Sequence, residues 1–445
     1  MGSGGSTGGV NGSGGATGGS GSGGQTGSGG SNGTGGSSPT GTGGAAGSVG
    51  NGGNLGSGGR SATGGVAGQG AAGSKGTGGA LGTGGSQTGG VGGGVGGNGG
   101  KGGAVGAGGT GGTATGGAGG TTAGATGPCD IYAAGNTPCV AAHSTVRALY
   151  GTYGGPLYQV RRASDKGTKD IPVLSAGGYA NASVQDSFCA GTSCTISVLY
   201  DQSANANHLT KAPPGGWLTN GGLEANATAA KITANGHTVY GLYTTSNFDD
   251  AAGAVGYRNN STKGVPTGDN PEAMYMVASG KHYNQWCCFD YGNAETNNID
   301  DGKATMEAVY FGNSTQWGRG SGSGPWVMAD LEDGVYAGGS TAAPATNTSL
   351  VANYVTVMLK GPSGNRFVLK GGDAQSGALA TKYDGARPAG YSPQKKQGAI
   401  ILGIGGDNSH TGEGTFFEGC MTAGVPSDSA DDAVEANIVA AGYGR

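Results

Sequence analysis

The amino-acid sequence predicts an all-β protein, a β-sandwich over residues 128–445 that is preceded by a disordered glycine-rich segment. Three observations lead to this prediction. The composition changes abruptly after Gly127. Beyond that point, short stretches of β-branched and aromatic residues alternate with turn-forming residues. Helical periodicity occurs in only two stretches, and many short strands with little helix favour a sandwich or a barrel.

The first 127 residues differ in composition from all that follows. They hold 62 of the 108 glycines and contain no Phe, Trp, Tyr, Asp, Glu or Cys. Their only charged side chains are those of Arg60, Lys75 and Lys101. Such a segment has almost no apolar surface to offset the entropy lost on ordering its backbone. We therefore expect residues 1–127 to be a disordered Gly/Ser/Thr-rich linker without chemistry of its own.

The remaining 318 residues are mildly acidic. They carry 20 Lys and Arg against 27 Asp and Glu, a net charge of −7. This balance disfavours nucleic-acid binding. No apolar stretch of about 18 residues is present, so we expect no membrane span. We also expect a monomer.

Eight strands are predicted after residue 128. Each is short, rich in β-branched or aromatic residues, and bounded by Gly, Asn, Asp or Ser. They cover residues 195–200, 274–278, 306–311, 326–329, 354–360, 366–370, 399–404 and 415–421.

Two helices are predicted from apolar residues at helical spacing. The first covers residues 138–150. The second covers residues 427–441, where Ser427 is placed to cap the helix and Val434 and Ile438 face inward.

Four of the seven cysteines form two closely spaced pairs. The spacings of ten and five residues suit local disulfides Cys129–Cys139 and Cys189–Cys194. They match no C-x-x-C zinc pattern and the five histidines are dispersed, so we expect no metal site. Two local bridges indicate an oxidising compartment. The protein is therefore expected to be extracellular, although no leader peptide is visible at Met1.

Cys287 and Cys288 are adjacent in the sequence. A bridge between neighbours is strained and rare, and two buried thiols would also fit. Two bridges to separate partners would disturb the other pairs, because only Cys420 remains outside them. The sequence pattern by itself leaves these alternatives open. Cys420 is the odd cysteine, and we expect it to be a buried free thiol on a strand.

Two groups of acidic residues follow predicted strands. Asp330 and Glu332 come at the end of the strand 326–329, and Asp333 is next to them. Strand periodicity puts Asp330 and Glu332 on one face, and paired carboxylates are typical of sugar-cleaving sites. A solvated strand end would explain the same residues.

Asp407 follows two glycines at the end of the most apolar predicted strand. Gly405 and Gly406 permit close approach of a ligand to the backbone, although a turn with a capping aspartate is the alternative. Trp286, Trp317 and Trp326 precede the first acidic group, and they suit the apolar faces of sugars or simple core packing. No nucleophile elbow, phosphate loop or dinucleotide fingerprint is present, and we expect no cofactor.

Residues 128–445 resemble the catalytic domain of glycoside hydrolase family 54, the α-L-arabinofuranosidase B family. The stretches that carry the resemblance are GPCDIY (127–132), PCVAAHST (138–145), GPLYQV (155–160), QDSFC (185–189), YDQS (200–203), NHLT (207–210), CCFDYGNAE (287–295), GSGPW (322–326), MADLE (328–332) and GAIILGIGGDNS (398–409). The family's fold is a concanavalin-like or jelly-roll β-sandwich, which agrees with the strand prediction.

The resemblance implies roles for individual residues. Glu332 matches the nucleophile and Asp407 the general acid/base. The Cys287–Cys288 pair matches a disulfide that lies against the arabinofuranose ring. Further sugar-binding positions are matched by Trp317, Asp330 and Gly406.

Two departures from the family pattern stand out. The residue after the nucleophile is usually Asn, whereas here it is Asp333, so a substrate-binding position carries an extra negative charge. The C-terminal arabinose-binding trefoil domain of familiar members is expected to be absent from this chain. We therefore expect the reaction class to follow the family and Asp333 to alter the fine specificity.

The resemblance implies a retaining α-L-arabinofuranosidase that removes terminal non-reducing residues from arabinan, arabinoxylan and related side chains of plant cell-wall polysaccharides. Glu332 and Asp407 should then lie about 5–5.5 Å apart. One alternative is a non-catalytic carbohydrate-binding or surface-display module on the same fold. Another is a structural cell-surface protein, which explains the glycine-rich segment but neither the carboxylates nor the adjacent cysteines.

Overall fold

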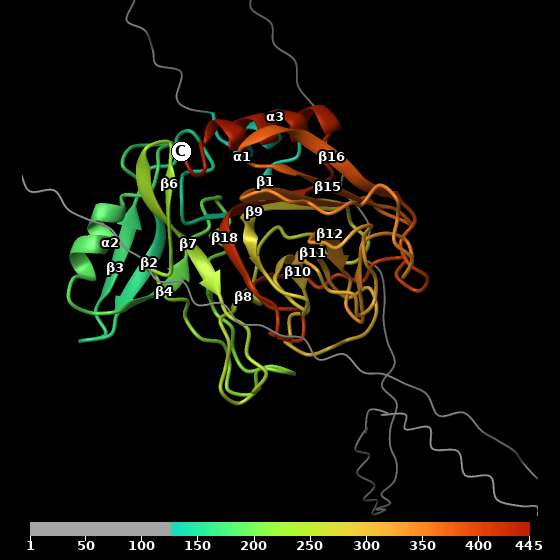
Figure 1. Ribbon diagram of the computed structural model, residues 1–445, viewed down its shortest axis with the longest axis horizontal. Helices are drawn as coiled ribbons and strands as arrows, with labels where there is room; N and C mark the ends of the chain where they lie inside the picture. The colour runs from blue at the N-terminus through green and yellow to red at the C-terminus, as the bar shows by residue number, and fades with distance from the viewer. Residues whose placement is uncertain (1–125) are drawn as a thin grey trace, which may run out of the picture. The chain divides into compact units, whose positions relative to one another are not determined.

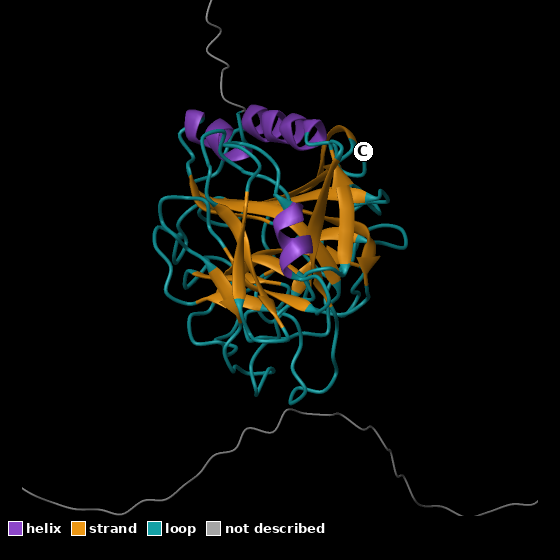
Figure 2. Ribbon diagram, turned by 90° about the vertical axis from the view of Figure 1, so that its left-hand side faces the viewer, coloured by secondary structure: helices purple, strands orange, loops and turns teal. Residues whose placement is uncertain are grey.

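The computed structural model describes residues 126–445, and most of their regular structure is β-strand (Figures 1 and 2). Two antiparallel sheets pack face to face, so the predicted β-sandwich is confirmed. The predicted disordered segment, residues 1–127, lies outside the described residues except for its last two. Among the described helices, none has the length and apolar character needed to cross a bilayer.

The first sheet has eight strands. Its order is β16-β15-β14-β9-β18-β7-β6, with β1 paired to β18. The strand bounds are β1 Cys139–Ser144, β6 Ala230–Ala234, β7 His237–Thr244, β9 Glu272–Tyr283, β14 Tyr354–Gly361, β15 Phe367–Asp373, β16 Ser376–Gly385 and β18 Gly414–Ala423.

The second sheet has ten strands in the order β13-β12-β11-β10-β17-β8-β5-β4-β2-β3. The strand bounds are β2 Pro156–Arg162, β3 Thr168–Pro172, β4 Cys194–Leu199, β5 Leu209–Lys211, β8 Tyr257–Asn259, β10 Asp290–Ala294, β11 Glu307–Gly312, β12 Trp326–Asp330, β13 Val335–Tyr336 and β17 Ala399–Leu402.

The described part of the chain contains three helices, α1 Pro128–Ala134, α2 Ala182–Phe188 and α3 Asp428–Ala440. Helices α1 and α3 lie over the outer face of the eight-stranded sheet (Figures 1 and 2). As predicted, Ser427 caps α3, because its hydroxyl oxygen accepts a hydrogen bond from the backbone N–H of Ala430 at 3.2 Å. Val434 and Ile438 are fully buried beneath α3.

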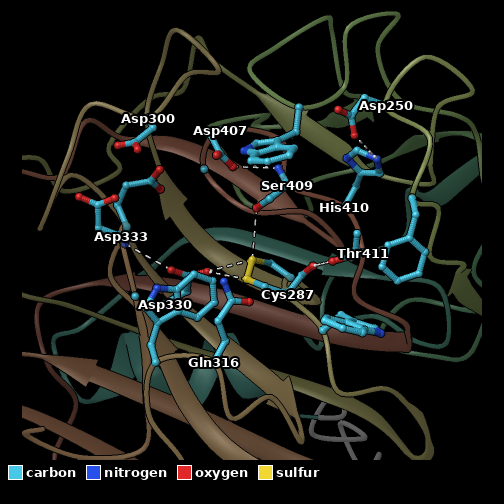
Figure 3. Close-up of a pocket in the computed structure, with 18 residues that line it drawn as sticks. Asp250, Cys287, Asp300, Gln316, Asp330, Asp333, Asp407, Ser409, His410 and Thr411 are labelled. Atoms are coloured by element: carbon cyan, nitrogen blue, oxygen red, sulfur yellow. Dashed lines mark hydrogen bonds and ion pairs between the residues drawn. A yellow bond between two sulfur atoms is a disulfide. The ribbon is translucent and has the colours of Figure 1, made fainter. Parts of the chain in front are cut away.

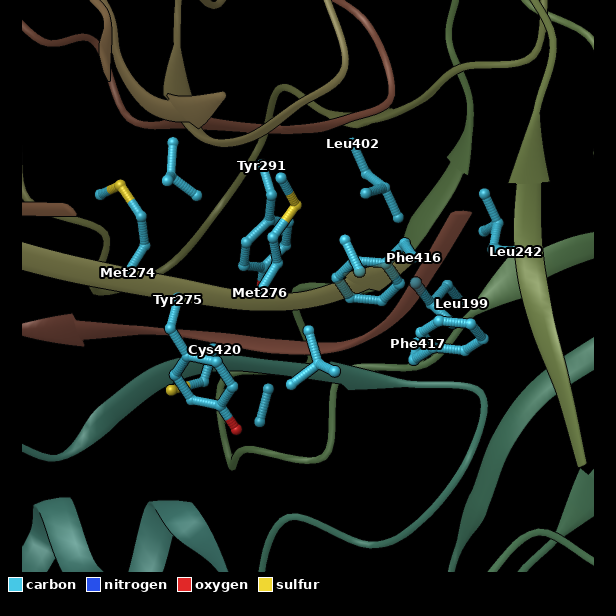
Figure 4. Packing of buried hydrophobic residues seen from close by; sticks show 14 of the residues in the cluster. Leu199, Leu242, Met274, Tyr275, Met276, Tyr291, Leu402, Phe416, Phe417 and Cys420 are labelled. Atoms are coloured by element: carbon cyan, nitrogen blue, oxygen red, sulfur yellow. The ribbon is translucent and has the colours of Figure 1, made fainter. Parts of the chain in front are cut away.

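The core lies between the two sheets. Tyr291 from β10 and Phe416 from β18 pack with their ring centroids 5.4 Å apart (Figure 4). Met276, Leu242 and Leu402 are fully buried in the same cluster. One face of each sheet is therefore buried in the core, and the outer face can be covered by loops or helices or can hold a site.

The predicted helix over residues 138–150 is wrong. Residues Cys139–Ser144 form β1, which pairs antiparallel with β18 so that Ala142 lies opposite Cys420. All six residues of β1 are buried, because α1 covers one face of the strand and the core the other. A strand buried on both faces does not alternate polar and apolar residues, and its spacing can resemble that of a helix.

The eight predicted strands all overlap observed ones, namely β4, β9, β11, β12, β14, β15, β17 and β18. The sequence analysis missed the short helices α1 and α2 and the remaining strands. Seven residues are too few for a clear helical period. The start of α1 is instead fixed by a side chain, since Asp130 Oδ2 accepts a hydrogen bond from Gly127 N at 2.9 Å.

Disulfide bonds join Cys129 to Cys139, Cys189 to Cys194, and Cys287 to its neighbour Cys288. The two local pairs follow the predicted spacing, and the adjacent pair follows the family resemblance. Cys420 is a buried free thiol on β18, as predicted.

Breaking one buried ion pair should destabilise the fold. Arg147 donates to both carboxylate oxygens of Glu418 at 2.6 and 2.8 Å, and neither side chain is more than 9% exposed. Glu418→Gln should lower the free energy of unfolding by about 3–5 kcal/mol, because it leaves the arginine charge buried without a counter-charge. Chemical denaturation measures this change.

The matched control is Asp384→Asn, which breaks the exposed pair of Asp384 with Arg366. It should cost less than about 1 kcal/mol. Equal losses in the two variants would contradict the assignment of Arg147–Glu418 as the stabilising pair.

Candidate active site

The predicted site residues gather on the outer face of the ten-stranded sheet. Successive side chains of β10, β11 and β12 point to opposite faces of the sheet. Tyr291 and Val309 point into the core. Asp290, Tyr310 and Asp330 point to the outer face. Loops cover this outer face, so its side chains are buried too. Burial on both faces explains why these strands show no regular alternation of polar and apolar residues in the sequence.

A cavity of about 440 Å³ opens over this face. All eight residues predicted to catalyse or bind line it: Cys287, Cys288, Trp317, Asp330, Glu332, Asp333, Gly406 and Asp407 (Figure 3). They come from the β9–β10 connection, the β11–β12 connection, the end of β12 with its turn, and the β17–β18 loop. The structure therefore brings the two acidic groups of the sequence into one site.

The Cys287–Cys288 disulfide lies against Asp330. The Oδ2 atom of Asp330 is 3.4 Å from Cys287 Sγ and 3.2 Å from Cys288 Sγ. Disulfide sulfur has no proton to donate, so these contacts are hydrogen bonds only when Asp330 is protonated. Burial raises the pKa of Asp330 to about 7, which favours the protonated form. Both sulfurs are oxidised, so they offer no thiolate to a metal ion.

Glu332 is held in a tight turn between β12 and β13. Its backbone has φ 61°, in the left-handed region, and Asp330 Oδ1 accepts a hydrogen bond from its N–H at 3.3 Å. The side chain is only 5% exposed. Burial, followed by the negative charges of Glu295, Asp330, Asp407 and Asp300, raises the pKa of Glu332 to about 11.

Asp407 stands on the loop that follows β17. Its Oδ1 accepts a hydrogen bond from the backbone N–H of Ser409 at 2.9 Å, which fixes the carboxylate within the turn. Asp407 is partly exposed, whereas Glu332 is buried. Gly406 is required here, because a Cβ atom at this position would overlap Oε2 of both Glu332 and Glu295. Because Gly406 has no side chain, the loop backbone can lie close to the carboxylates of Glu295 and Glu332. The sequence analysis expected such close approach for a ligand.

Arg258 from β8 supports the Asp407 loop and was missed by the sequence analysis. Its guanidinium donates to the carbonyl oxygen of Gly406 at 2.6 Å, to Asn408 Oδ1 at 2.9 Å and to the carbonyl oxygen of Glu295. Arg258 is 2% exposed, and burial lowers its pKa to about 10, so the side chain stays charged near neutral pH. A lone arginine on a short strand gives no signal in the sequence.

Glu295 was also missed, although it ends the quoted stretch 287–295. The side chain is fully buried, and its Oε2 has no hydrogen-bond partner among the described residues. This oxygen lies beside Oε2 of Glu332, since a Cβ atom on Gly406 would touch both. Burial raises the pKa of Glu295 to about 6. Two carboxyl groups this close favour a state in which they share one proton.

Two of the three tryptophans singled out in the sequence line the cavity, Trp286 and Trp317. Trp326 does not. It is 2% exposed, and its indole N–H donates to the carbonyl oxygen of Ser321 at 2.9 Å, so it serves as packing. Trp217 and Phe248 also line the cavity and were not predicted, because they stand on loops without a recognisable motif.

Comparison with known proteins identifies relatives of this arrangement. The family model "Alpha-L-arabinofuranosidase B, catalytic" matches residues 128–444. Alpha-L-arabinofuranosidase B of Aspergillus oryzae is 53% identical over 325 residues, which are 71% of this chain and 62% of the relative. An arabinofuranosidase/B-xylosidase of Trichoderma koningii is 54% identical over 322 residues, 71% of this chain and 63% of the relative. The chain thus spans a little over three fifths of these relatives' length.

Two solved structures are similar in sequence and in fold. A GH54 α-L-arabinofuranosidase soaked with a cyclic sulfate inhibitor is 51% identical, with a TM-score of 0.68. An arabinofuranosidase complexed with arabinofuranosyl-α-1,2-xylobiose is 50% identical, with a TM-score of 0.68. Each comparison covers 72% of this chain and 66% of the other.

The buried carboxyl groups predict that stability falls as the pH rises. A carboxyl group whose pKa is raised on folding stabilises the fold at low pH, and this contribution is lost as the pH rises through the folded-state pKa. For Glu295, with a folded-state pKa of about 6, the loss falls between about pH 4.5 and pH 6.5. Over this pH range the unfolding free energy of Glu295→Gln should fall by about 2 kcal/mol less than that of the wild type.

Denaturation at a series of pH values measures the effect. Asp432→Asn, at an exposed position on α3, is the matched control and should keep the wild-type pH dependence. The same pH dependence in Glu295→Gln and in the wild type would show that this carboxyl group does not take up a proton on folding.

Proposed function

This chain belongs to the α-L-arabinofuranosidase B family, and we propose that it is a retaining α-L-arabinofuranosidase. Its proposed substrates are terminal non-reducing α-L-arabinofuranosyl residues on arabinan, arabinoxylan and related side chains. The observation that carries the proposal is that Glu332 and Asp407 line one cavity, whose wall contains the Cys287–Cys288 disulfide. A module that only binds sugar does not need a carboxyl group buried at the electrostatic cost of Glu332 beside a second, partly exposed one.

In the first step, Glu332 attacks the anomeric carbon through an oxocarbenium-like transition state, and a glycosyl–enzyme ester forms. Asp407 gives its proton to the departing glycosidic oxygen, so the rest of the chain leaves as an alcohol. The partial exposure of Asp407 supports this role, because the acid must face the leaving group and later water.

In the second step, Asp407 removes a proton from a water molecule that attacks the same carbon. The ester bond to Glu332 breaks, arabinose leaves with its original configuration, and Asp407 regains its proton. We expect the two carboxyl groups to be about 5–5.5 Å apart, the spacing that double displacement needs.

A nucleophile must be ionised, yet the surrounding carboxylates favour a proton on Glu332. Glu295 and Glu332 share one proton, and we infer that this proton resides on Glu295 in the reactive form of the site. Thr305 Oγ1 lies 2.5 Å from both Glu295 Oε1 and the carbonyl oxygen of Gly302. A hydroxyl group has one proton and can donate to only one of these oxygens. If Glu295 is protonated, it donates to Thr305, Thr305 donates to Gly302, and Glu332 stays ionised.

The remaining cavity residues suit a small sugar. The disulfide offers an apolar surface to the ring, Trp317 an aromatic one, and Asp330 a carboxyl group for the sugar hydroxyls. Asp333 is exposed and adds a negative charge at the mouth of the cavity, so we expect it to tune substrate preference rather than the reaction.

We infer that the enzyme acts outside the cell. The inference rests on the three disulfide bonds, which persist in oxidising compartments.

Activity assays of two variants test the two roles. Glu332→Gln should lose activity by about 10⁴-fold or more on every arabinofuranoside, because no ester can form. Asp407→Asn should lose about 10²–10⁴-fold on an arabinoxylo-oligosaccharide. Its loss on 4-nitrophenyl α-L-arabinofuranoside should be smaller, because 4-nitrophenolate leaves without a proton.

The measurement is the initial rate of release of arabinose and of 4-nitrophenol. Asp384→Asn, which lies outside the cavity, is the control with wild-type rates. Substantial activity in Glu332→Gln would reject Glu332 as the nucleophile. Equal losses on the two substrates in Asp407→Asn would reject Asp407 as the acid.

A further inference from the structure

Three large aromatic side chains are exposed at the mouth of the cavity. Trp217 is 53% exposed, Phe248 64% and Trp286 42%, and all three line the cavity. The other large apolar side chains exposed in residues 126–445 are aliphatic, and none of them lines it: Leu174, Leu223, Ile299 and Val351. Isolated exposed apolar residues are ordinary, but a cluster at one cavity mouth indicates a binding surface. We call Trp217, Phe248 and Trp286 the aromatic rim.

The aromatic rim is held in place by packing and by backbone hydrogen bonds. Phe248 packs edge-on against Trp286, with ring centroids 5.5 Å apart and an interplanar angle of 84°. The backbone N–H of Trp286 donates to Asn284 Oδ1 at 3.0 Å, and Tyr310 donates its hydroxyl proton to the carbonyl oxygen of Trp286 at 3.1 Å.

The loops that carry Trp217 and Phe248 are joined to each other. Asn220 donates to the carbonyl oxygen of Ala251 at 2.7 Å, and Thr219 donates to that of Asp250 at 3.3 Å. The Asp250 side chain in turn lies 3.6 Å from His410 Nε2, on the loop that carries Asp407. The rim is thus one preformed wall, so a ligand would not have to order it.

The rim lies next to the proposed general acid. The backbone N–H of Trp217 donates to the carbonyl oxygen of Asp407 at 3.1 Å. The general acid protonates the oxygen of the leaving group, so the leaving group must be on the same side of the cavity as Asp407. A sugar ring bound there would therefore lie beside Trp217.

Resting on the proposed function, we propose that the aromatic rim is the subsite for the leaving group, and that it binds neutral sugar residues of an oligosaccharide or polysaccharide chain. Aromatic faces match the C–H faces of sugar rings. The carboxyl groups of Asp250, Asp300 and Asp333 also line the cavity, and they would repel uronic acids. The rim thereby determines which polysaccharide chains bind to the enzyme, while the disulfide side of the cavity binds the arabinofuranosyl residue.

Comparing two substrates tests the subsite. Arabinofuranosyl-xylobiose has a leaving group long enough to reach the rim, whereas the methanol leaving group of methyl α-L-arabinofuranoside is not. For Trp217→Ala and Phe248→Ala, kcat/KM should fall about tenfold more on the first substrate than on the second. Leu174→Ala removes a similarly exposed apolar side chain elsewhere and should change neither value. Equal effects on both substrates, or no effect, would overturn the proposal.

A binding measurement separates this proposal from the proposed catalysis. Calorimetry with the Glu332→Gln variant should detect binding of xylotriose or arabinotriose, and adding Trp217→Ala should weaken it about fivefold or more. Unchanged binding of both trisaccharides, or no binding of either, would overturn the rim as a sugar subsite. Failure of the wild-type protein to hydrolyse any arabinofuranoside would reject the proposed function, and the trisaccharide measurement would still decide the rim.

Discussion

Negative charge buried over one face of the ten-stranded sheet is the constraint on which the rest of the site depends. Asp290, Asp330, Glu295, Glu332 and Asp407 share this space, and burial opposes ionisation of the first four. Carboxyl groups so placed either take up protons or need donors around them. The site uses both means. Thr305 is hydrogen-bonded to Glu295, and the backbone N–H of Glu332 donates to Asp330. Arg258 adds a positive charge beneath the Asp407 loop.

The scaffold around the carboxyl groups follows from this constraint. Gly406 lets the loop backbone pass beside the carboxylates of Glu295 and Glu332, where any side chain would overlap them. The disulfide gives Asp330 two sulfur neighbours without introducing further charge. Arg258 reaches the loop from β8, so the strand order that brings β8 beside β17 also brings a cation to the site.

Sequence reasoning located the strands whose β-branched and aromatic residues fill the core, and it singled out both groups of acidic residues that line the cavity through their position after strands. It failed at β1, because residues buried on both faces have no period of two. It also failed at Arg258 and Glu295, whose roles come from contacts across β8, β10 and the loop after β17. Of the aromatic rim it singled out Trp286 but missed Trp217 and Phe248, because loops far apart in sequence meet only in the folded chain.

The central claim is that Glu332 forms a covalent bond with the arabinofuranosyl residue, while Asp407 acts as the general acid and then as the general base. The most direct measurement is the configuration of the product when Glu332→Gly hydrolyses 4-nitrophenyl α-L-arabinofuranoside in the presence of azide. Azide can occupy the space left by the missing carboxylate and attack from that side. The account predicts β-L-arabinofuranosyl azide, of inverted configuration. The α-configured azide, identified by NMR, would contradict it.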